Sequence, residues 1–336
     1  MNSLLGICIP TYKRPDQLTA CVRSILLAAS HHEVPVYIAD DSTDETNEQA
    51  IKQLQREYPF IFTSKNKANL GIDKNILNAV DLCPCKYAWM MGEDDRLTPD
   101  AVDQILGLLS SLDSEQWPFI FVNYASVDAD IHYYLNRQVL PLEEDLIESA
   151  EQFLVSHAWA AGFIGGCIVN TTAWEKIERE HYIGTYFAHI GIIMEMIQGR
   201  QVHLVARPLV LNRCGEPRLF TWSDATFTVA GGWGQLMQRL VPIYGRELCQ
   251  RATMAFEAAH GLYSLRFLCY TRADYAYRTK HYREFIQPLT RSRGYQLLAR
   301  IIAYTPPALF YSLRFVISRY RRMVNPKVAT DKYLNQ

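Results

Sequence analysis

The sequence predicts an α/β fold in which helices flank a mostly parallel central sheet, with a helical extension at the C-terminal end. Over about the first 130 residues, short apolar runs alternate with segments of helical period, a pattern typical of a parallel sheet covered by helices. Beyond Arg246 the pattern becomes mainly helical. With 49% hydrophobic and 12% aromatic residues, the chain can bury a large core.

Each element follows from its own local pattern. Short apolar runs predict strands, in chain order, at 5–9, 34–39, 60–63, 87–91, 119–122 and 205–211. Apolar residues that recur every three or four positions predict helices between them, at 14–29, 44–58, 72–83 and 99–112. We place soft boundaries so that an α/β region covers 1–140, its continuation covers 141–245, and a helical, basic extension covers 246–336.

Charge and cysteine usage narrow the class of protein. The 34 basic and 35 acidic residues give a net charge of −1, without the basic excess expected of a nucleic-acid-binding protein, so we expect no nucleic-acid partner. The eight cysteines lack zinc-ligand spacing and favour a reducing cytoplasm.

We expect no secretory signal, and the longest uncharged stretch, 158–174, is shorter than the roughly 20 apolar residues of a membrane span. The sequence does not indicate the oligomeric state.

Two acidic clusters follow two of the predicted strands. Asp40-Asp41 comes after the second strand, and Glu93-Asp94-Asp95 comes after the strand at 87–91. In an open α/β sheet these strand ends are where ligands bind, and carboxylates suit Mg²⁺ or Mn²⁺ holding a diphosphate. The alternative is that both clusters are solvated turns that cap the next helices.

Neither of the known glycine-rich phosphate loops is present, so a nucleotide would be held by other means. A metal ion that bridges the diphosphate is one, and Tyr12, at the end of the first strand, offers a ring for a base to stack on.

Four motifs then occur in order over about 100 residues, a spacing specific enough to be improbable by chance. They are Ile9-Pro10-Thr11-Tyr12-Lys13-Arg14, Ala39-Asp40-Asp41-Ser42-Thr43-Asp44, Asn69-Leu70-Gly71, and Gly92-Glu93-Asp94-Asp95 with Pro99. The chain resembles the inverting family 2 glycosyltransferases of the GT-A fold, of the bacterial surface-polysaccharide type.

The resemblance implies roles residue by residue for a nucleotide-diphospho-sugar donor. Pro10, Thr11 and Tyr12 would line the base pocket, and Asp41, with Asp40, would read the base. Glu93 would face the ribose or a metal-bound water. Asp94, with Asp95, would hold the metal ion, and the remaining donor-binding residues would be Arg14, Asn69 and Lys74. The usual Asp-Ser-Asp-Asp is Gly92-Glu93-Asp94-Asp95 here, so the first acidic position is lost.

The general base is harder to assign. The family usually carries an acidic pair in its second half, but the equivalent stretch, 184–191, has none. His189 occupies the plausible place, since a histidine with a pKa near 6.5 can take the acceptor's proton. The alternatives are that His189 is a hydrogen-bonded core residue or that Glu195 is the base.

Two basic features remain. Arg213 follows the strand at 205–211 and would fold over the diphosphate, or is an ordinary surface arginine. Residues 278–322 hold ten basic residues and one acidic residue, Glu284, interleaved with apolar ones. That composition fits either the surface of an anionic membrane or a helical domain with a solvated basic face.

The sequence therefore predicts a metal-dependent inverting hexosyl- or deoxyhexosyltransferase, cytoplasmic or peripheral on the inner membrane face. Its acceptor would be a hydroxyl of a glycan or lipid-linked glycan. A sugar nucleotidyltransferase is one alternative, although it would normally show a glycine-rich N-terminal loop. A non-catalytic sugar- or membrane-binding module is the other.

Overall fold

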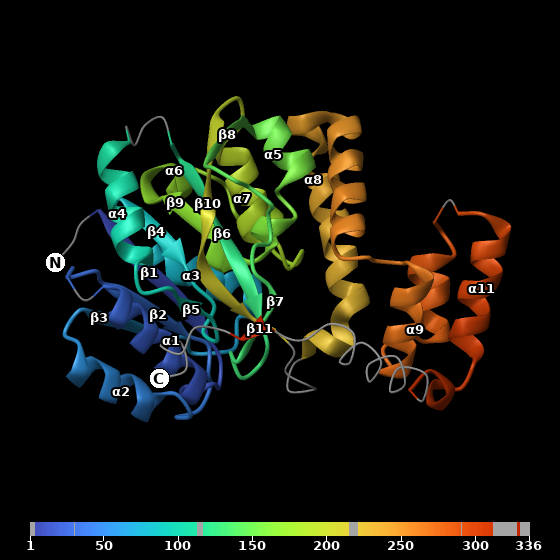
Figure 1. Cartoon of the computed structure of the whole chain (residues 1–336), viewed down its shortest axis with the longest axis horizontal. Coiled ribbons are helices and arrows are strands. Elements are labelled where there is room, and N and C mark those ends of the chain that lie inside the picture. Colours follow the sequence, from blue (N-terminus) through green and yellow to red (C-terminus); the bar gives the residue numbers. More distant parts are fainter. Residues whose placement is uncertain are drawn as a thin grey trace.

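The structure is a computed structural model that describes residues 4–29, 31–112, 117–214, 221–289, 291–311 and 328–329. Figure 1 shows a central sheet flanked by helices, with the last helices forming a smaller body beside it. The α/β fold with a helical C-terminal region is thus confirmed.

The first half of the chain builds the parallel part of the sheet. Four strands lie in the order β4-β1-β2-β3: β1 (Leu5–Thr11), β2 (Val36–Asp40), β3 (Ile61–Lys65) and β4 (Tyr87–Met90). The connecting helices are α1 (Pro15–Ala28), α2 (Glu48–Glu57), α3 (Ile72–Asp81) and α4 (Ala101–Ser111). Every strand and helix predicted over this region is present, with shifts at the ends.

The second half extends the same sheet with mixed pairing. The strand β9 (Cys167–Asn170) lies antiparallel between β4 and β6 (Phe119–Val127), and β10 (Gln201–Arg213) runs parallel to β6. Short strands complete it: β5 (Arg96–Leu97), β7 (Tyr133–Asn136), β8 (Leu146–Ser149) and β11 (Val328–Ala329). The sequence analysis missed β9 because a four-residue strand is fixed by its two neighbours rather than by its own pattern.

The helices of the second half cover the sheet and lead away from it. The short ones are α5 (Ala150–Ser156), α6 (Thr171–Glu175) and α7 (Ala188–Met196), with single turns at Ala160–Gly162, Ile164–Gly166 and Glu180–Tyr182. The long α8 (Thr221–Ala259) is broken at Gly245, whose φ of 79° is left-handed. Gly232 lets α8 approach the chain before α7, because a Cβ there would lie 2.1 Å from the Thr185 carbonyl oxygen.

The C-terminal helices have a hydrophobic core of their own. They are α9 (Leu265–Ala273), α10 (Thr279–His281), a π-helical turn at Tyr282–Ile286, and α11 (Arg293–Tyr304). Phe227 of α8 reaches into this core and stacks on Tyr277 and His281, with ring centroids 5.4 and 5.0 Å apart. The main core runs from Leu5 to Phe256, so α8 contributes to both.

Candidate active site

Three parallel strands bring the polar motifs of the sequence to one edge of the sheet. Thr11 pairs with Asp40 at the ends of β1 and β2, and Cys8 of β1 pairs with Met90 at the end of β4. The residues that follow these strand ends therefore lie together at their carboxyl edge, where open α/β sheets bind ligands.

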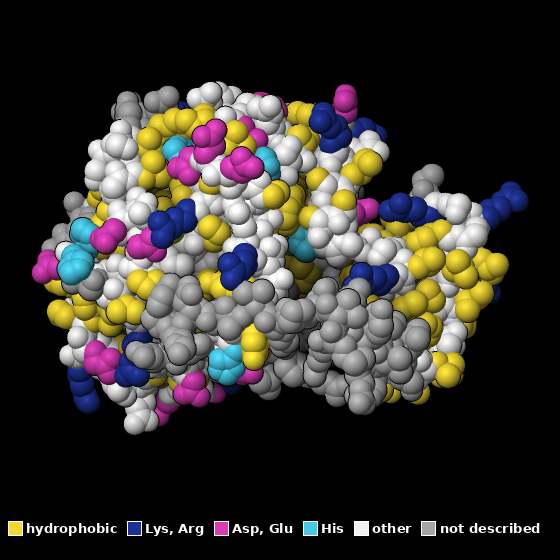
Figure 2. All heavy atoms as spheres, viewed as in Figure 1, with side chains coloured by type: hydrophobic (Ala, Val, Ile, Leu, Met, Phe, Trp, Pro, Cys, Tyr) yellow, Lys and Arg dark blue, Asp and Glu magenta, His cyan; other side chains and the backbone are white. Residues whose placement is uncertain are grey.

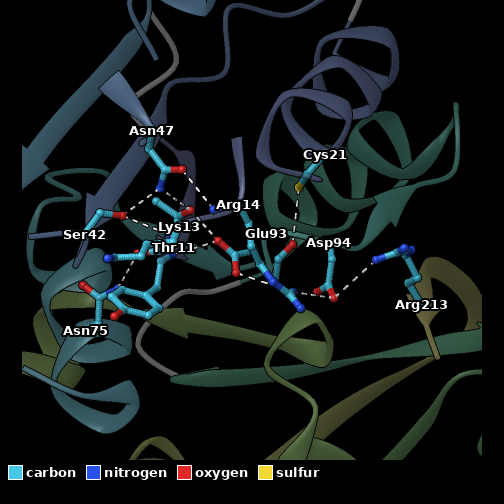
Figure 3. Close-up of polar contacts among 12 residues, drawn as sticks. Thr11, Lys13, Arg14, Cys21, Ser42, Asn47, Asn75, Glu93, Asp94 and Arg213 are labelled. Carbon is cyan, nitrogen blue, oxygen red and sulfur yellow. Dashed lines mark hydrogen bonds and ion pairs between the residues drawn. The ribbon is translucent and has the colours of Figure 1, made fainter. Parts of the chain in front are cut away.

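Glu93 is the centre of a hydrogen-bond network at this edge (Figure 3). Its Oε2 accepts hydrogen bonds from the Thr11 hydroxyl and from the Tyr12 backbone N–H at 2.9 Å. Its Oε1 lies 3.5 Å from Arg14 Nη1. Burial raises the pKa of Glu93 to about 7, against the opposing effect of these hydrogen bonds and of Arg14. Glu93 thus ties the first motif to the fourth.

Asp94 lies between two arginines from distant parts of the chain. Its Oδ2 is 2.9 Å from Arg14 Nη1 and 3.9 Å from Arg213 Nη1, and its side chain is 27% exposed. Figure 3 shows both guanidinium groups directed at this carboxylate. The structure therefore brings together three of the predicted site residues: Arg14 and Asp94, which follow β1 and β4, and Arg213, at the end of β10.

Asp95 points into the protein. Its Oδ1 accepts the Arg213 backbone N–H at 3.0 Å, and burial together with the charge of Asp94 raises its pKa. A Cβ at Gly92 would lie 2.3 Å from Asp95 Oδ2. The glycine at the family's first acidic position thus makes room for the Asp95 carboxylate.

Asp40 and Asn47 hold the second motif against the first. Asp40 Oδ1 accepts hydrogen bonds from the Ser42 N–H and from Asn47 Nδ2, each at 3.0 Å. Asn47 also bonds the Thr11 hydroxyl at 3.1 Å and accepts the Arg14 N–H at 3.0 Å. The sequence analysis did not name Asn47, which reads as an ordinary helix-start residue.

The carboxylate of Asp41 is hydrogen-bonded to the loop before α3. Its two oxygens accept the backbone N–H groups of Leu70 and Gly71 at 2.8 to 3.1 Å and the Asn66 amide at 3.0 Å. These four contacts use about all the acceptor sites of a carboxylate. Asp41 could form hydrogen bonds with a base only if this loop gave up some of these four contacts.

The other donor-site candidates are less constrained. Tyr12 is 43% exposed, and Pro10 and Lys74 are half-buried. Asn69 is exposed and accepts the Gly71 N–H at 2.9 Å. The residue after Tyr12, Lys13, has a left-handed φ of 56°, an unfavourable conformation of the kind that clusters at functional sites.

A cavity of about 540 Å³ opens beside the acidic motif. Asp94, Asp95 and His189 line it together, so the structure brings the predicted metal-binding residues and the predicted base to one space. Apolar and aromatic side chains form much of the remaining wall, among them Ile72, Ile76, Trp159, Tyr186, Phe187 and Phe256. The volume suits a sugar-sized ligand.

His189 lies at the start of α7 and is 1% exposed. Its Nε2 is 3.1 Å from the Ala161 carbonyl oxygen, which only accepts, so Nε2 carries the proton and Nδ1 the lone pair. Among the described residues, the buried Nδ1 has no hydrogen-bond partner. Burial lowers the pKa of His189 to about 4, so the ring is neutral at physiological pH.

Glu195, the rival base, lies two turns further along α7. Its Oε2 accepts a hydrogen bond from the Tyr182 hydroxyl at 2.7 Å. Whereas His189 contributes to the cavity wall, Glu195 is not among the described residues that line it.

Asp73 is a site residue that the sequence analysis missed. This buried carboxylate accepts backbone N–H groups of Gly184, Tyr186 and Ala188 at 2.8, 3.0 and 3.3 Å, and so shapes the turn before His189. It lies on the buried face of α3 with Ile76 and Leu77. An aspartate at the apolar spacing of an amphipathic helix was the available signal.

The candidate site fits a metal ion only if a bound substrate supplies some of the ion's ligands. Within the described ranges, no three or more His, Cys, Asp or Glu side chains form a group that could hold an ion. Mg²⁺, however, commonly uses one or two carboxylates plus phosphate oxygens and water. The partly exposed Asp94 carboxylate at the cavity meets that need.

The protein thus has a GT-A-like α/β fold with a polar site at the carboxyl ends of its parallel strands. Residues 6–163, which contain all four motifs, match the model of the family described as "Glycosyl transferase family 2". The resemblance seen in the motifs is thus confirmed over residues 6–163.

Individual relatives agree with this family. The chain is 27% identical over 225 residues to the abequosyltransferase RfbV of Salmonella typhimurium, covering 62% of this chain and 66% of that protein. It is 21% identical over 149 residues to the glycosyltransferase GlyG of Streptococcus pneumoniae, covering 44% of this chain and 49% of that one. The chain thus spans about two thirds of the length of the first relative and about half of the length of the second.

A solved structure shares the fold over nearly the whole chain. The crystal structure of S. aureus TarS 1-349, in complex with UDP-GlcNAc, matches with a TM-score of 0.55 at 12% identity. The match covers 93% of this chain and 92% of that one. Within the described residues, none of the helices combines the length and the apolarity needed to cross a bilayer.

Proposed function

We propose that the protein transfers a sugar, with inversion, from a nucleotide-diphospho-sugar to a hydroxyl of a glycan or lipid-linked glycan. The observation that carries this proposal is the shared cavity, because Asp94 and His189 line one sugar-sized space beside the Thr11, Tyr12 and Glu93 network. A donor held by the network would present its anomeric carbon to that space.

The donor's base and ribose fit the network at the ends of β1 and β2. The exposed Tyr12 ring provides a stacking face, and Glu93 lies where the resemblance places a ribose contact. Asp41 would support the pocket by fixing the loop at 66–71 through its backbone hydrogen bonds.

The diphosphate would meet positive charge at Arg14 and Arg213, which flank Asp94. When bound, Mg²⁺ or Mn²⁺ held by Asp94 would stabilise the charge of the departing phosphate. Arginines that already face the Asp94 carboxylate can turn to phosphate oxygens, for which their planar groups are suited.

His189 would take the acceptor's proton through Nδ1. The Ala161 carbonyl fixes the tautomer that leaves this nitrogen free of hydrogen. A base with a pKa of about 4 is weak. It nevertheless suffices late in the reaction, because a hydroxyl becomes strongly acidic as its oxygen bonds to the anomeric carbon.

The similarity to an abequosyltransferase and the apolar cavity wall favour a deoxyhexose donor, since an apolar wall offers no hydrogen-bond partner to an additional hydroxyl.

Thermal-shift titration with UDP, dTDP, CDP and GDP in the presence of Mn²⁺ tests donor binding. One nucleotide should raise the melting temperature selectively, since a ligand at a hundred times its Kd adds about 2.7 kcal/mol of stability. No stabilisation by any of them would contradict the proposal.

The Tyr12 ring gives a first prediction. Tyr12→Ala should weaken binding of the stabilising nucleotide by about 1–3 kcal/mol, because a base loses its stacking partner. Tyr12→Phe keeps the ring and should bind almost normally. Calorimetric titration of both variants measures the difference, and equal losses would show that the hydroxyl is the important group.

The raised pKa of Glu93 gives a second prediction. Ionised Glu93 accepts two hydrogen bonds and balances Arg14, so kcat/KM should fall as the pH drops through about 7 and the carboxylate is protonated. Glu93→Gln mimics the neutral form and should show a low, flat profile through this range. A variant that retains the wild-type acid limb would assign that limb to another group.

A further inference from the structure

Helix α11 has two apolar faces, of which the protein covers one. Ala299, Ile302 and Ala303 point into the C-terminal core and are at most 8% exposed. On the other side, Leu297, Leu298, Ile301 and Tyr304 are 47 to 60% exposed. Their spacing of three and four residues forms one continuous stripe along the helix.

Further large apolar side chains are exposed after the helix. Leu309 and Tyr311, on the next turn of chain, are 64% and 57% exposed. Figure 2 shows hydrophobic side chains gathered over the C-terminal helices, with Lys and Arg side chains at the margin of that area. Scattered exposed apolar residues are normal on a protein surface, but a contiguous group of large ones marks an interaction surface.

Positive charge lies along one edge of the stripe. Arg293 and Arg300 are exposed on α11, seven residues apart and therefore on the same side of the helix. The Arg300 guanidinium lies over the Tyr304 ring at 5.8 Å, and Arg283 Nη2 is 3.5 Å from the Tyr304 hydroxyl. Tyr304 is thus an aromatic ring flanked by two cations.

We propose that this stripe docks the protein on an anionic lipid bilayer, with α11 lying in the plane of the interface. Leucine and isoleucine side chains would enter the acyl boundary, Tyr304 would lie at the headgroup level, and the arginines would pair with lipid phosphates. A second protein copy would gain from the apolar stripe but would have to bring matching acidic groups. Within α11 itself no residue is acidic.

Docking is tested by co-sedimentation of the full chain with vesicles of phosphatidylcholine alone and of phosphatidylcholine mixed with phosphatidylglycerol. The wild type should bind the anionic vesicles, and binding should weaken with salt because the charge contribution is screened. Leu297→Gln/Ile301→Gln should lower the partition coefficient at least about tenfold. Arg293→Gln/Arg300→Gln should lower it by roughly tenfold or more on anionic vesicles only.

Leu135→Gln, at an exposed apolar residue of β7, is the matched control and should bind as the wild type does. Unchanged melting temperature and nucleotide binding in the variants would show that their fold and donor site are intact. Absence of vesicle binding by the wild type would overturn the proposal. So would light scattering that shows a dimer dissociated by Leu297→Gln/Ile301→Gln, because the stripe would then be a contact between copies.

Discussion

Asp94→Ala should lower the rate of sugar transfer by about a hundredfold or more. Its carboxylate is the one we propose to hold the metal ion at the departing diphosphate, and losing such charge stabilisation in the transition state typically costs this much. The side chain is partly exposed, and its ion-pair partners within the described part of the chain are Arg14 and Arg213 rather than core residues, so the variant should fold normally.

Steady-state kinetics with the preferred donor, together with a melting curve, measures this effect. Asp103→Ala is a suitable control, because Asp103 is also an aspartate whose carboxylate contacts a basic side chain, but it lies on α4 and is hydrogen-bonded to His32 at 2.7 Å. That variant should keep the wild-type rate. A folded Asp94→Ala protein with normal turnover would rule out Asp94 as a metal ligand in the reaction.

His189→Gln should lower the rate with acceptor by about 10²–10⁴ while donor affinity stays nearly unchanged, since general-base catalysis acts in the transition state. Glutamine is preferred to alanine because its amide can donate to the Ala161 carbonyl and fill the buried space. Glu195→Gln tests the rival base and should have little effect, since Glu195 bonds Tyr182 and lies outside the cavity lining.

The pH profile separates His189 from Glu93. A histidine base works in its neutral form, so its rate falls as the pH drops through its pKa. Burial moves that acid limb from near 6.5 to about 4, below the limb near 7 that we assign to Glu93. The lower limb should disappear in His189→Gln. A variant that keeps both its rate and this limb would make His189 a structural residue.

The donor half of the site was predictable from local sequence. Parallel strands end at one edge of a sheet, so motifs that follow the first, second and fourth strands had to meet there. The structure adds details that depend on three-dimensional packing. Glu93 reaches back to Thr11 and Tyr12, and Asp41 turns to the loop before α3 rather than to open solvent.

The second half was less predictable because distant segments build it. Asp73 on α3 shapes the turn before His189, a contact across more than a hundred residues of chain that no local pattern contains. The burial of His189, and hence the direction of its pKa shift, depends on packing from Ala161 and the cavity wall. For Arg213 the structure shows that the guanidinium group faces Asp94, and its role at the diphosphate stays a prediction.

The central claim is that this cavity transfers sugar from a nucleotide-diphospho-sugar, and release of nucleoside diphosphate tests it most directly. Wild-type protein should be incubated with UDP-, dTDP-, CDP- and GDP-sugars, Mn²⁺ and a hydroxyl acceptor, and the nucleotides separated by chromatography. The account predicts that one donor class releases its nucleoside diphosphate, that chelation of the metal stops the release, and that Asp94→Ala and His189→Gln lack it. Release that persists undiminished in both variants, or none from any donor with the folded wild type, would contradict it.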